Sequence, residues 1–128
     1  MEVFKYITSA HFDAIQSAGS LNPRPVDGFT YGIPEDPLLW RESIHEVFKH
    51  LEKYSGASPI VLLKFWIDKL DKDAFIQEAD EPVWFKMDTR RPLNEYRRDD
   101  YRLPEVVVKR PILLDEITQI SPLPKLGE

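Results

Sequence analysis

Glu105 is the residue whose type and position most favour chemistry in this sequence. It stands at the entrance of a β-branched run, Val106-Val107-Val108, which ends at a basic pair and Pro111. A run of valines is typical of a buried strand, so a carboxylate at its entrance either lies at the rim in water or serves a cleft. In a cleft, a fixed carboxylate can stabilise positive charge that develops during a reaction. At the rim, it would pair with Arg102 or Lys109.

A basic segment surrounds this strand, although the chain as a whole is acidic. Residues 86 to 110 contain eight Lys and Arg against five Asp and Glu, whereas the whole chain has a net charge of -5. Such a segment, which includes Arg97 and Arg98, can attract an anion locally without making the protein a general nucleic-acid binder. Tyr96 and Tyr101 lie among the arginines, which favours a phosphate-bearing, partly aromatic ligand. The alternative is a solvated loop of Arg and Asp pairs.

Length and composition predict one globular domain over residues 1 to 128. The chain is 42% hydrophobic and 30% charged, which is ordinary for a folded protein. It has no cysteine, which excludes disulfides and thiolate zinc sites. The sequence contains no P-loop, dinucleotide-binding, nucleophile-elbow or HExxH motif, and we predict no metal site.

The hydropathy pattern bears on location. No apolar run reaches membrane-spanning length, and the N-terminal residues lack the basic-then-apolar order of a signal peptide. We therefore expect a cytoplasmic protein, or a secreted effector without a classical signal peptide, with no membrane contact.

The first half of the chain predicts two strands and two helices. Val3 to Ile7 reads as a short strand, followed by a helix that Ser9 can cap and that ends at Gly19. Phe29 to Ile33 follows a turn-rich connection as a second strand. A helix is expected from Pro37 to about Tyr54, because Asp36 is a good N-cap and apolar residues recur at helical spacing.

The second half predicts mainly strands, which makes the fold class α+β with antiparallel or mixed strands. Pro59 to Trp66 is the longest apolar run and is expected to be the central strand. Lys69 to Glu81 is acidic and predicts a short helix or an irregular excursion. The remaining expectations are a strand over 82 to 88, a polar loop over 89 to 102, a strand over 104 to 109 and an apolar segment over 113 to 120 behind it.

Three strings resemble small ADP-ribosyltransferase-fold proteins, including DNA-modifying DarT toxins and transferase domains of bacterial polymorphic toxins. The first is Tyr-x-Thr-Ser at 6 to 9 with the helix that follows it, which is similar to the family's opening. The second is IVLLKFWIDKL at 60 to 70, and the third is the Glu-Val-hydrophobic-Val string that begins at Glu105. Asp27-Gly28-Phe29 is also similar to a string in an uncharacterised group of very small proteins, which have a histidine where Tyr31 stands here.

The resemblance implies an ADP-ribosyltransferase-like split β-sandwich of short, mostly antiparallel strands with two early helices. It implies NAD as the substrate, bound between two small sheets, and ADP-ribose transfer to an unidentified protein or nucleic-acid acceptor. Glu105 would then be the catalytic carboxylate, and Tyr31 would lie against the nicotinamide. Tyr6 and Thr8 would contact the ribose or adenosine. An arginine, from Arg24, Arg97 or Arg98, would meet the diphosphate.

Tyr6 departs from the family pattern, which commonly has histidine at this position. A tyrosine offers one hydroxyl in place of two ring nitrogens. Lys5, next to it, points to the opposite face by strand alternation and is no obvious substitute. Three interpretations stay open: a divergent active transferase, a nucleotide-binding domain without turnover, or a scaffold with the fold alone. The competing function is a non-catalytic interaction module that uses the arginine-rich loop.

Overall fold

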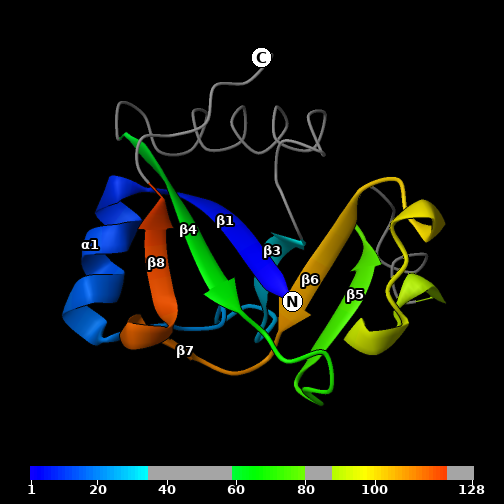
Figure 1. Cartoon of the computed structure of the whole chain (residues 1–128). Helices are drawn as coiled ribbons and strands as arrows, with labels where there is room; N and C mark the ends of the chain where they lie inside the picture. The colour runs from blue at the N-terminus through cyan, green and yellow to red at the C-terminus, as the bar shows by residue number, and fades with distance from the viewer. Residues whose placement is uncertain (35–58, 80–87, 121–128) are drawn as a thin grey trace.

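The computed structural model describes residues 1–34, 59–79 and 88–120 and has α+β architecture. Six antiparallel strands form one sheet in the order β5-β6-β3-β1-β4-β8, and β2 and β7 form a separate two-stranded sheet. The sheet twists strongly from β8 and β4 on one side to β6 and β5 on the other (Figure 1). The elements are β1 (Glu2–Thr8), α1 (Ser9–Ala18), β2 (Ser20–Leu21), β3 (Thr30–Pro34), β4 (Ile60–Trp66), β5 (Ala74–Glu78), β6 (Pro104–Val108), β7 (Ile112–Leu113), β8 (Ile117–Ile120) and the 3-10 turns η2 (Leu93–Glu95), η3 (Arg98–Asp100) and η4 (Leu114–Glu116).

The first strand and helix follow local signals in the sequence. Thr8, the last residue of β1, caps α1 by accepting a hydrogen bond from the His11 N–H at 3.1 Å. The helix therefore begins at Ser9, and Thr8 rather than Ser9 is the cap. At the other end, Gly19 adopts a left-handed conformation with φ of 80°, and its N–H bonds to the Ile15 carbonyl. The predicted end of the helix at Gly19 is confirmed.

The two faces of the sheet have different neighbours. Alternate residues of β1, β5 and β6, such as Val3, Ile76 and Val106, belong to the main hydrophobic core together with Ile15 of α1. Because successive side chains of a strand point to opposite faces, Gln77 and Glu105, which are paired next to Ile76 and Val106, lie on the second face. This alternation decides where the candidate residues of β6 can act.

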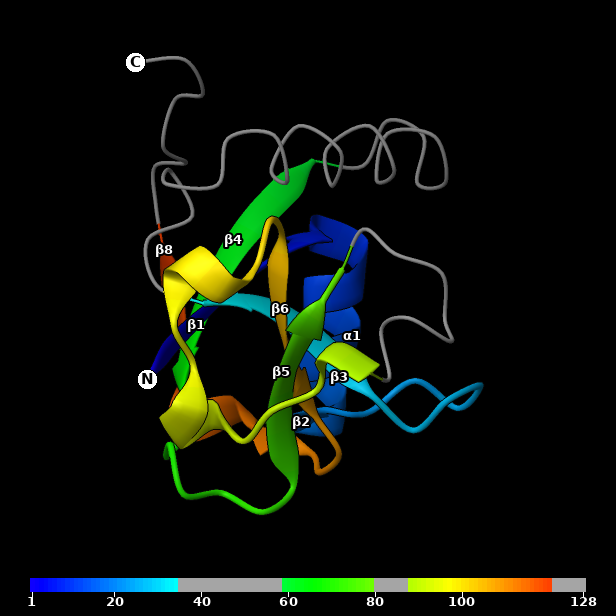
Figure 2. The same cartoon turned by 90° about the vertical axis from the view of Figure 1, so that its right-hand side faces the viewer.

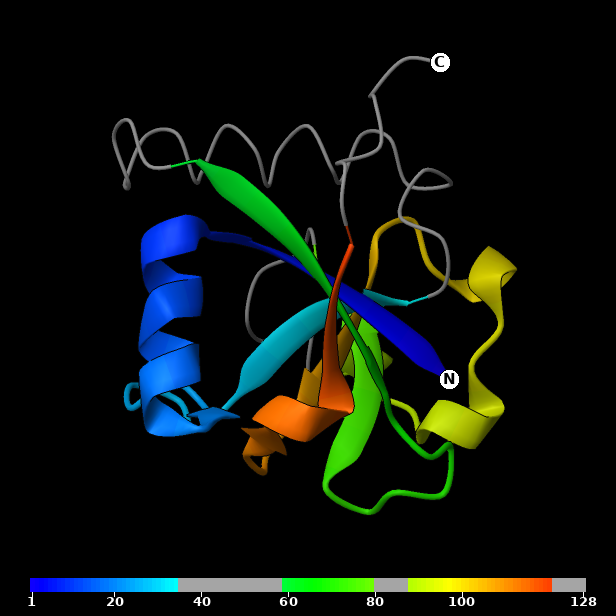
Figure 3. The same cartoon turned by 60° about the vertical axis from the view of Figure 1, so that its left-hand side comes forward.

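β1 and β3 separate soon after they meet. β1 pairs with β4 at seven positions, but with β3 only through Val3 with Pro34 and Phe4 with Ile33. At this meeting point β3 has a glycine, Gly32, where an added Cβ would collide with the Val3 side chain. Beyond it, β1 (dark blue) and β3 (cyan) diverge towards α1, which lies across the opening (Figure 3).

The structure corrects two predictions about the second half of the chain. The acidic segment after Lys69, expected to be helical or irregular, contains β5, which pairs with β6 at five positions. The sequence signal for β5 is the short alternation Ala74-Phe75-Ile76-Gln77. The strand itself is stabilised by β6, a partner far away in sequence. β4 is confirmed as a strand, but it is second from the edge, and the centre of the sheet is β3 and β1.

Two further predictions fall on residues that are not described. The expected helix from Pro37 to Tyr54 lies outside the described residues, as does the expected strand over 82 to 88 except for its last position. In the parts of the chain that the structure describes, no helix has the length and apolarity needed to cross a bilayer.

Candidate functional site

Glu105 lies on the second face of the sheet, near the start of β6, and its side chain is half-buried. The side-chain amide of Gln77, directly across on β5, donates a hydrogen bond to Glu105 Oε1 at 2.8 Å. Gln77 is itself held, because Arg90 Nε donates to Gln77 Oε1 at 3.1 Å. Gln77 is only 2% exposed, so its side chain has little freedom to move. The carboxylate of Glu105 is therefore pre-positioned by an amide that an arginine orients.

Tyr31 lies on the same face, because it is paired with Val107 of β6. Its hydroxyl donates to Asp27 Oδ2 at 2.8 Å, and the guanidinium of Arg24 lies 5.1 Å from the ring centroid. Arg24 also bonds to Asp27 Oδ2 at 2.7 Å, and Asp27 Oδ1 accepts the Phe29 N–H at 2.9 Å. Burial tends to raise the pKa of Asp27, but these three hydrogen bonds outweigh it and lower the pKa below its usual value. The loop before β3 thus fixes both the ring and the hydroxyl of Tyr31.

Lys5 is a member of this site that the sequence interpretation set aside. Its Nζ donates to the main-chain carbonyl of Tyr31 at 2.8 Å, next to the point where β1 and β3 separate. Desolvation lowers the pKa of Lys5 to about 8, and the charge of Glu105 opposes this shift while Arg24 adds to it. The charge of Glu105 also contributes to the raised pKa of Tyr31, behind burial and the contact with Asp27. Lys5, Tyr31 and Glu105 therefore interact electrostatically although they come from three strands.

A signal for Lys5 is present in the sequence. It is the one charged residue between Val3 and Ile7, on the side of β1 that alternation assigns to the core. A lysine on the core side of a strand needs a buried acceptor or a neighbouring carboxylate, and here it has the Tyr31 carbonyl and the charge of Glu105. Lys5 points to the face opposite Tyr6, as alternation predicts, but its side chain is long enough to reach the Tyr31 carbonyl.

Aromatic rings and cations extend the site along the second face. The guanidinium of Arg90 lies 4.6 Å from the Phe75 ring centroid and 5.6 Å from that of Phe29. Lys109 Nζ lies 5.5 Å from the Phe75 centroid, and the Phe29 and Phe75 rings meet edge to face at 5.7 Å. These contacts favour a fixed orientation for Arg90, which in turn holds Gln77. Arg90 therefore links Gln77, and through it Glu105, to a row of cations and aromatic rings that continues to Lys109.

The other predicted residues of the first strand, Tyr6 and Thr8, are buried. Tyr6 is 4% exposed, so its side chain is buried in the described structure. Thr8 is buried too, and its hydroxyl caps α1. The assignment of these two residues to ribose or adenosine stays a prediction, but their hydrogen-bonding groups are less accessible than those of Glu105 and Tyr31.

Arg97 and Arg98 are exposed and belong to a loop on the other side of β5. Figure 2 shows this loop, in yellow, beside β5. Its tyrosines Tyr96 and Tyr101 pack against the main hydrophobic core, which lies on the face opposite Glu105. Among the three predicted arginines, Arg24 is the one that the structure brings to Tyr31.

The arrangement offers a fixed carboxylate, an aromatic ring and cations on one partly exposed face. Such a set can bind an anionic ligand that has a ring and can stabilise positive charge next to Glu105. Within the described ranges, no group of three or more His, Cys, Asp or Glu side chains is arranged to hold a metal ion.

The fold and the site define an α+β protein with a twisted antiparallel sheet and a carboxylate-centred polar face. No family model and no curated protein matches the chain. The crystal structure of protein CC0527 from Caulobacter crescentus is similar, with a TM-score of 0.51, 19% identity, and coverage of 99% of this chain and 91% of that chain. A double mutant of the same protein gives a TM-score of 0.49 at 17% identity with the same coverage. At this level of identity, the similarity to CC0527 shows a shared fold alone.

Proposed function

We propose that the protein cleaves NAD at the nicotinamide glycosidic bond and transfers ADP-ribose to an acceptor, with Glu105 as the central carboxylate. The observation that carries this proposal is the fixed position of Glu105. The Gln77 amide donates a hydrogen bond to one Glu105 oxygen at 2.8 Å, and the negative charge of Glu105 affects the pKa values of both Lys5 and Tyr31. A preorganised carboxylate beside an aromatic ring suits a reaction in which positive charge develops on a sugar.

The proposed step breaks the bond between ribose C1′ and the nicotinamide nitrogen. The electron pair of that bond leaves with nicotinamide, and the ribose gains oxocarbenium character that the Glu105 carboxylate stabilises. A nucleophilic group of the acceptor, or water, then forms a bond to C1′ and loses a proton. The acceptor, protein or nucleic acid, is the second substrate in transfer, and water replaces it in simple cleavage.

Other residues of the site have supporting roles in this proposal. Tyr31 supplies a ring for nicotinamide, with its hydroxyl fixed by Asp27 at 2.8 Å. Arg24, exposed beside that ring, supplies a charge for the diphosphate. Lys5 holds the Tyr31 main chain and is a positioning residue rather than a ligand contact.

The test compares nicotinamide release from labelled NAD by the wild-type protein and by Glu105→Gln. The substitution keeps the size of the side chain and removes its charge, so turnover should fall about a hundredfold or more, by analogy with loss of one electrostatic group in other enzymes. Glu2→Gln is the matched control, because Glu2 is an exposed glutamate on the same sheet, 3.6 Å from Lys64. Equal turnover of wild-type and Glu105→Gln would end the assignment of Glu105.

A second candidate is a module that binds a nucleotide without turnover. It is favoured by the buried state of Tyr6, 4% exposed, at the position where the resembling enzymes commonly have histidine, and by the Arg24 guanidinium over the Tyr31 ring. This candidate predicts NAD binding in calorimetry with no nicotinamide release from either wild type or Glu105→Gln. Failure to bind NAD at all would reject both candidates.

A further inference from the structure

A basic groove lies at the far end of β5 and β6 from Glu105. It has a volume of about 610 Å³ and is formed by the β4–β5 loop, the start of β5, residues 90–95 and Lys109 after β6. Its lining includes five cationic side chains, Lys69, Lys72, Arg90, Arg91 and Lys109, against the two carboxylates of Asp71 and Glu95. In a chain with a net charge of -5, this concentration of positive charge is local.

Three of these cations are not paired with any carboxylate in the part of the chain that the structure describes. Within the described ranges, Lys69, Lys72 and Lys109 make no ion pair with a described carboxylate. Asp71, one of the two acidic residues in the lining, is already paired with Arg110, whose Nη2 lies 3.1 Å from Asp71 Oδ2. The groove therefore has more positive charge than its own acidic groups neutralise, which favours an anionic occupant.

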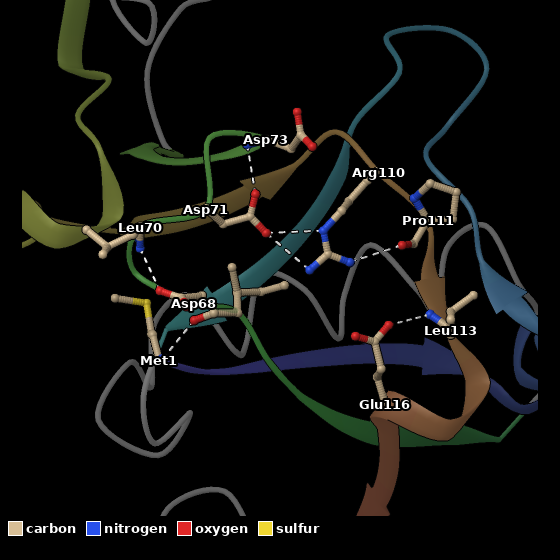
Figure 4. A network of polar contacts seen from close by, with 10 residues as sticks. Met1, Asp68, Leu70, Asp71, Asp73, Arg110, Pro111, Leu113 and Glu116 are labelled. Atoms are coloured by element: carbon tan, nitrogen blue, oxygen red, sulfur yellow. Dashed lines mark hydrogen bonds and ion pairs between the residues drawn. The ribbon is translucent and has the colours of Figure 1, made fainter.

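The loop that carries Lys69 and Lys72 is held in a defined shape. Asp68 Oδ1 accepts the Leu70 N–H at 2.9 Å, and Asp71 Oδ1 accepts the Asp73 N–H at 2.8 Å. Arg110 Nε also donates to Asp71 Oδ2 at 3.1 Å, which ties the loop to the segment after β6 (Figure 4). The main chain that presents the two lysines is thus ordered before any ligand binds, which reduces the entropy lost on binding.

The size and surroundings of the groove favour a compact anion. A volume of about 610 Å³ is within the range of small-molecule sites. The rest of the chain is acidic and repels a long polyanion that extends beyond the groove. A short anion inside the groove is largely screened from that charge. Several cations around one groove match a ligand with several adjacent negative charges.

We propose that this groove binds a small oligophosphate, meaning a compact ligand with two or more linked phosphate groups, centred on Lys69, Lys72 and Lys109 rather than on Glu105. Arg90, which also lines the groove, bonds to Gln77 next to Glu105. Lys69 and Lys72 contact the oligophosphate from the β4–β5 loop and Lys109 from the end of β6. Glu105 and Lys109 are four residues apart on an extended strand, which corresponds to about 13 Å. The proposal does not depend on NAD chemistry at Glu105.

The test uses inorganic tripolyphosphate as the probe, titrated calorimetrically into the full-length protein at low salt without divalent cations. Lys72→Ala with Lys109→Ala should weaken binding about tenfold or more, because two direct charges are lost. Arg97→Ala with Arg98→Ala is the matched control, since it removes the same charge from exposed positions outside the groove lining. That control should change affinity less than about twofold, because exposed charges outside the lining are screened by salt and water.

Three results would overturn the proposal. The first is absence of tripolyphosphate binding, or equal weakening by the two double variants, which would indicate only a general charge effect. The second is displacement of tripolyphosphate by NAD, or its loss in Glu105→Gln, which would make the groove part of the Glu105 site. The third is displacement by a single-stranded oligonucleotide at lower concentration than tripolyphosphate itself needs, which would assign the groove to nucleic acid. Binding that survives NAD and Glu105→Gln supports a site centred on the three lysines.

Discussion

Two glutamates on neighbouring strands of this sheet differ in their burial and in the groups that bond to their carboxylates. Glu78, at the end of β5, is 8% exposed, and its carboxylate accepts the main-chain N–H groups of Arg102 at 2.7 Å and Leu103 at 2.6 Å. Glu105, on β6, is half-buried and accepts from the side-chain amide of Gln77 at 2.8 Å. The two carboxylates lie on opposite faces, because Gln77 rather than Glu78 is paired with Glu105.

The difference separates a structural carboxylate from a candidate functional one. Glu78 fixes the entry of the chain into β6, and both of its oxygens are used by backbone donors that have no substitute inside the protein. Glu105 is oriented by a side chain and remains partly accessible on a face that also has Tyr31, and its charge acts on Lys5. Burial alone would rank Glu78 as the more constrained glutamate, but accessibility and neighbours favour Glu105 for chemistry.

The largest expected effect on stability comes from Glu78→Gln. The new side-chain NH2 group faces a backbone N–H, and two donors cannot form a hydrogen bond. We therefore expect a loss of about 2 kcal/mol in the free energy of unfolding. Glu105→Gln should lose less than about 1 kcal/mol, because its site is partly solvated. Urea denaturation of both variants at pH 7 measures the difference. Comparable losses would remove the distinction between the two carboxylates.

A smaller effect is expected for Gln77→Leu, which frees Glu105 without altering the contacts of Glu78. The change removes the amide between Arg90 and Glu105 at a site that is 2% exposed, and should lower the free energy of unfolding by about 1 kcal/mol. If Glu105 acts in NAD cleavage, turnover should fall about tenfold, because the carboxylate loses its orientation. Gln77→Glu would not serve as a control, since it adds a charge beside Glu105. Unchanged turnover in Gln77→Leu would show that the amide has no part in positioning Glu105.

A third expected effect is a change of pH dependence in Lys5→Gln. The pKa of Lys5 is lowered from 10.5 to about 8 in the folded protein, so between these values the unfolded chain binds more protons. Lys5 therefore makes stability rise as pH increases from 8 towards 10.5, and the variant should show a flatter rise. Denaturation of both proteins at pH 7.5 and 9.5 measures this rise in stability. Both pH values lie below the range where ionisation of Tyr31 begins to oppose the rise. A steeper rise in Lys5→Gln would contradict the assignment.

Local patterns in the sequence were sufficient for the elements near the candidate site. The valine run predicted β6, and the apolar spacing with Gly19 predicted α1. Those signals act within a few residues, through backbone preference, capping and side-chain burial. The same kind of reasoning missed β5, because a five-residue strand with an acidic approach is stabilised mainly by its pairing with β6.

The sequence by itself determined that Glu105 opens a buried strand, and that Tyr31 follows a turn-rich segment. Only the tertiary structure decided which groups surround them. Gln77 reaches Glu105 across 28 positions of sequence, and Lys5 reaches the Tyr31 carbonyl across 26. The physical reason is that strand register and the separation of β1 from β3 set these contacts, and both depend on the packing of the whole sheet rather than on neighbouring residues.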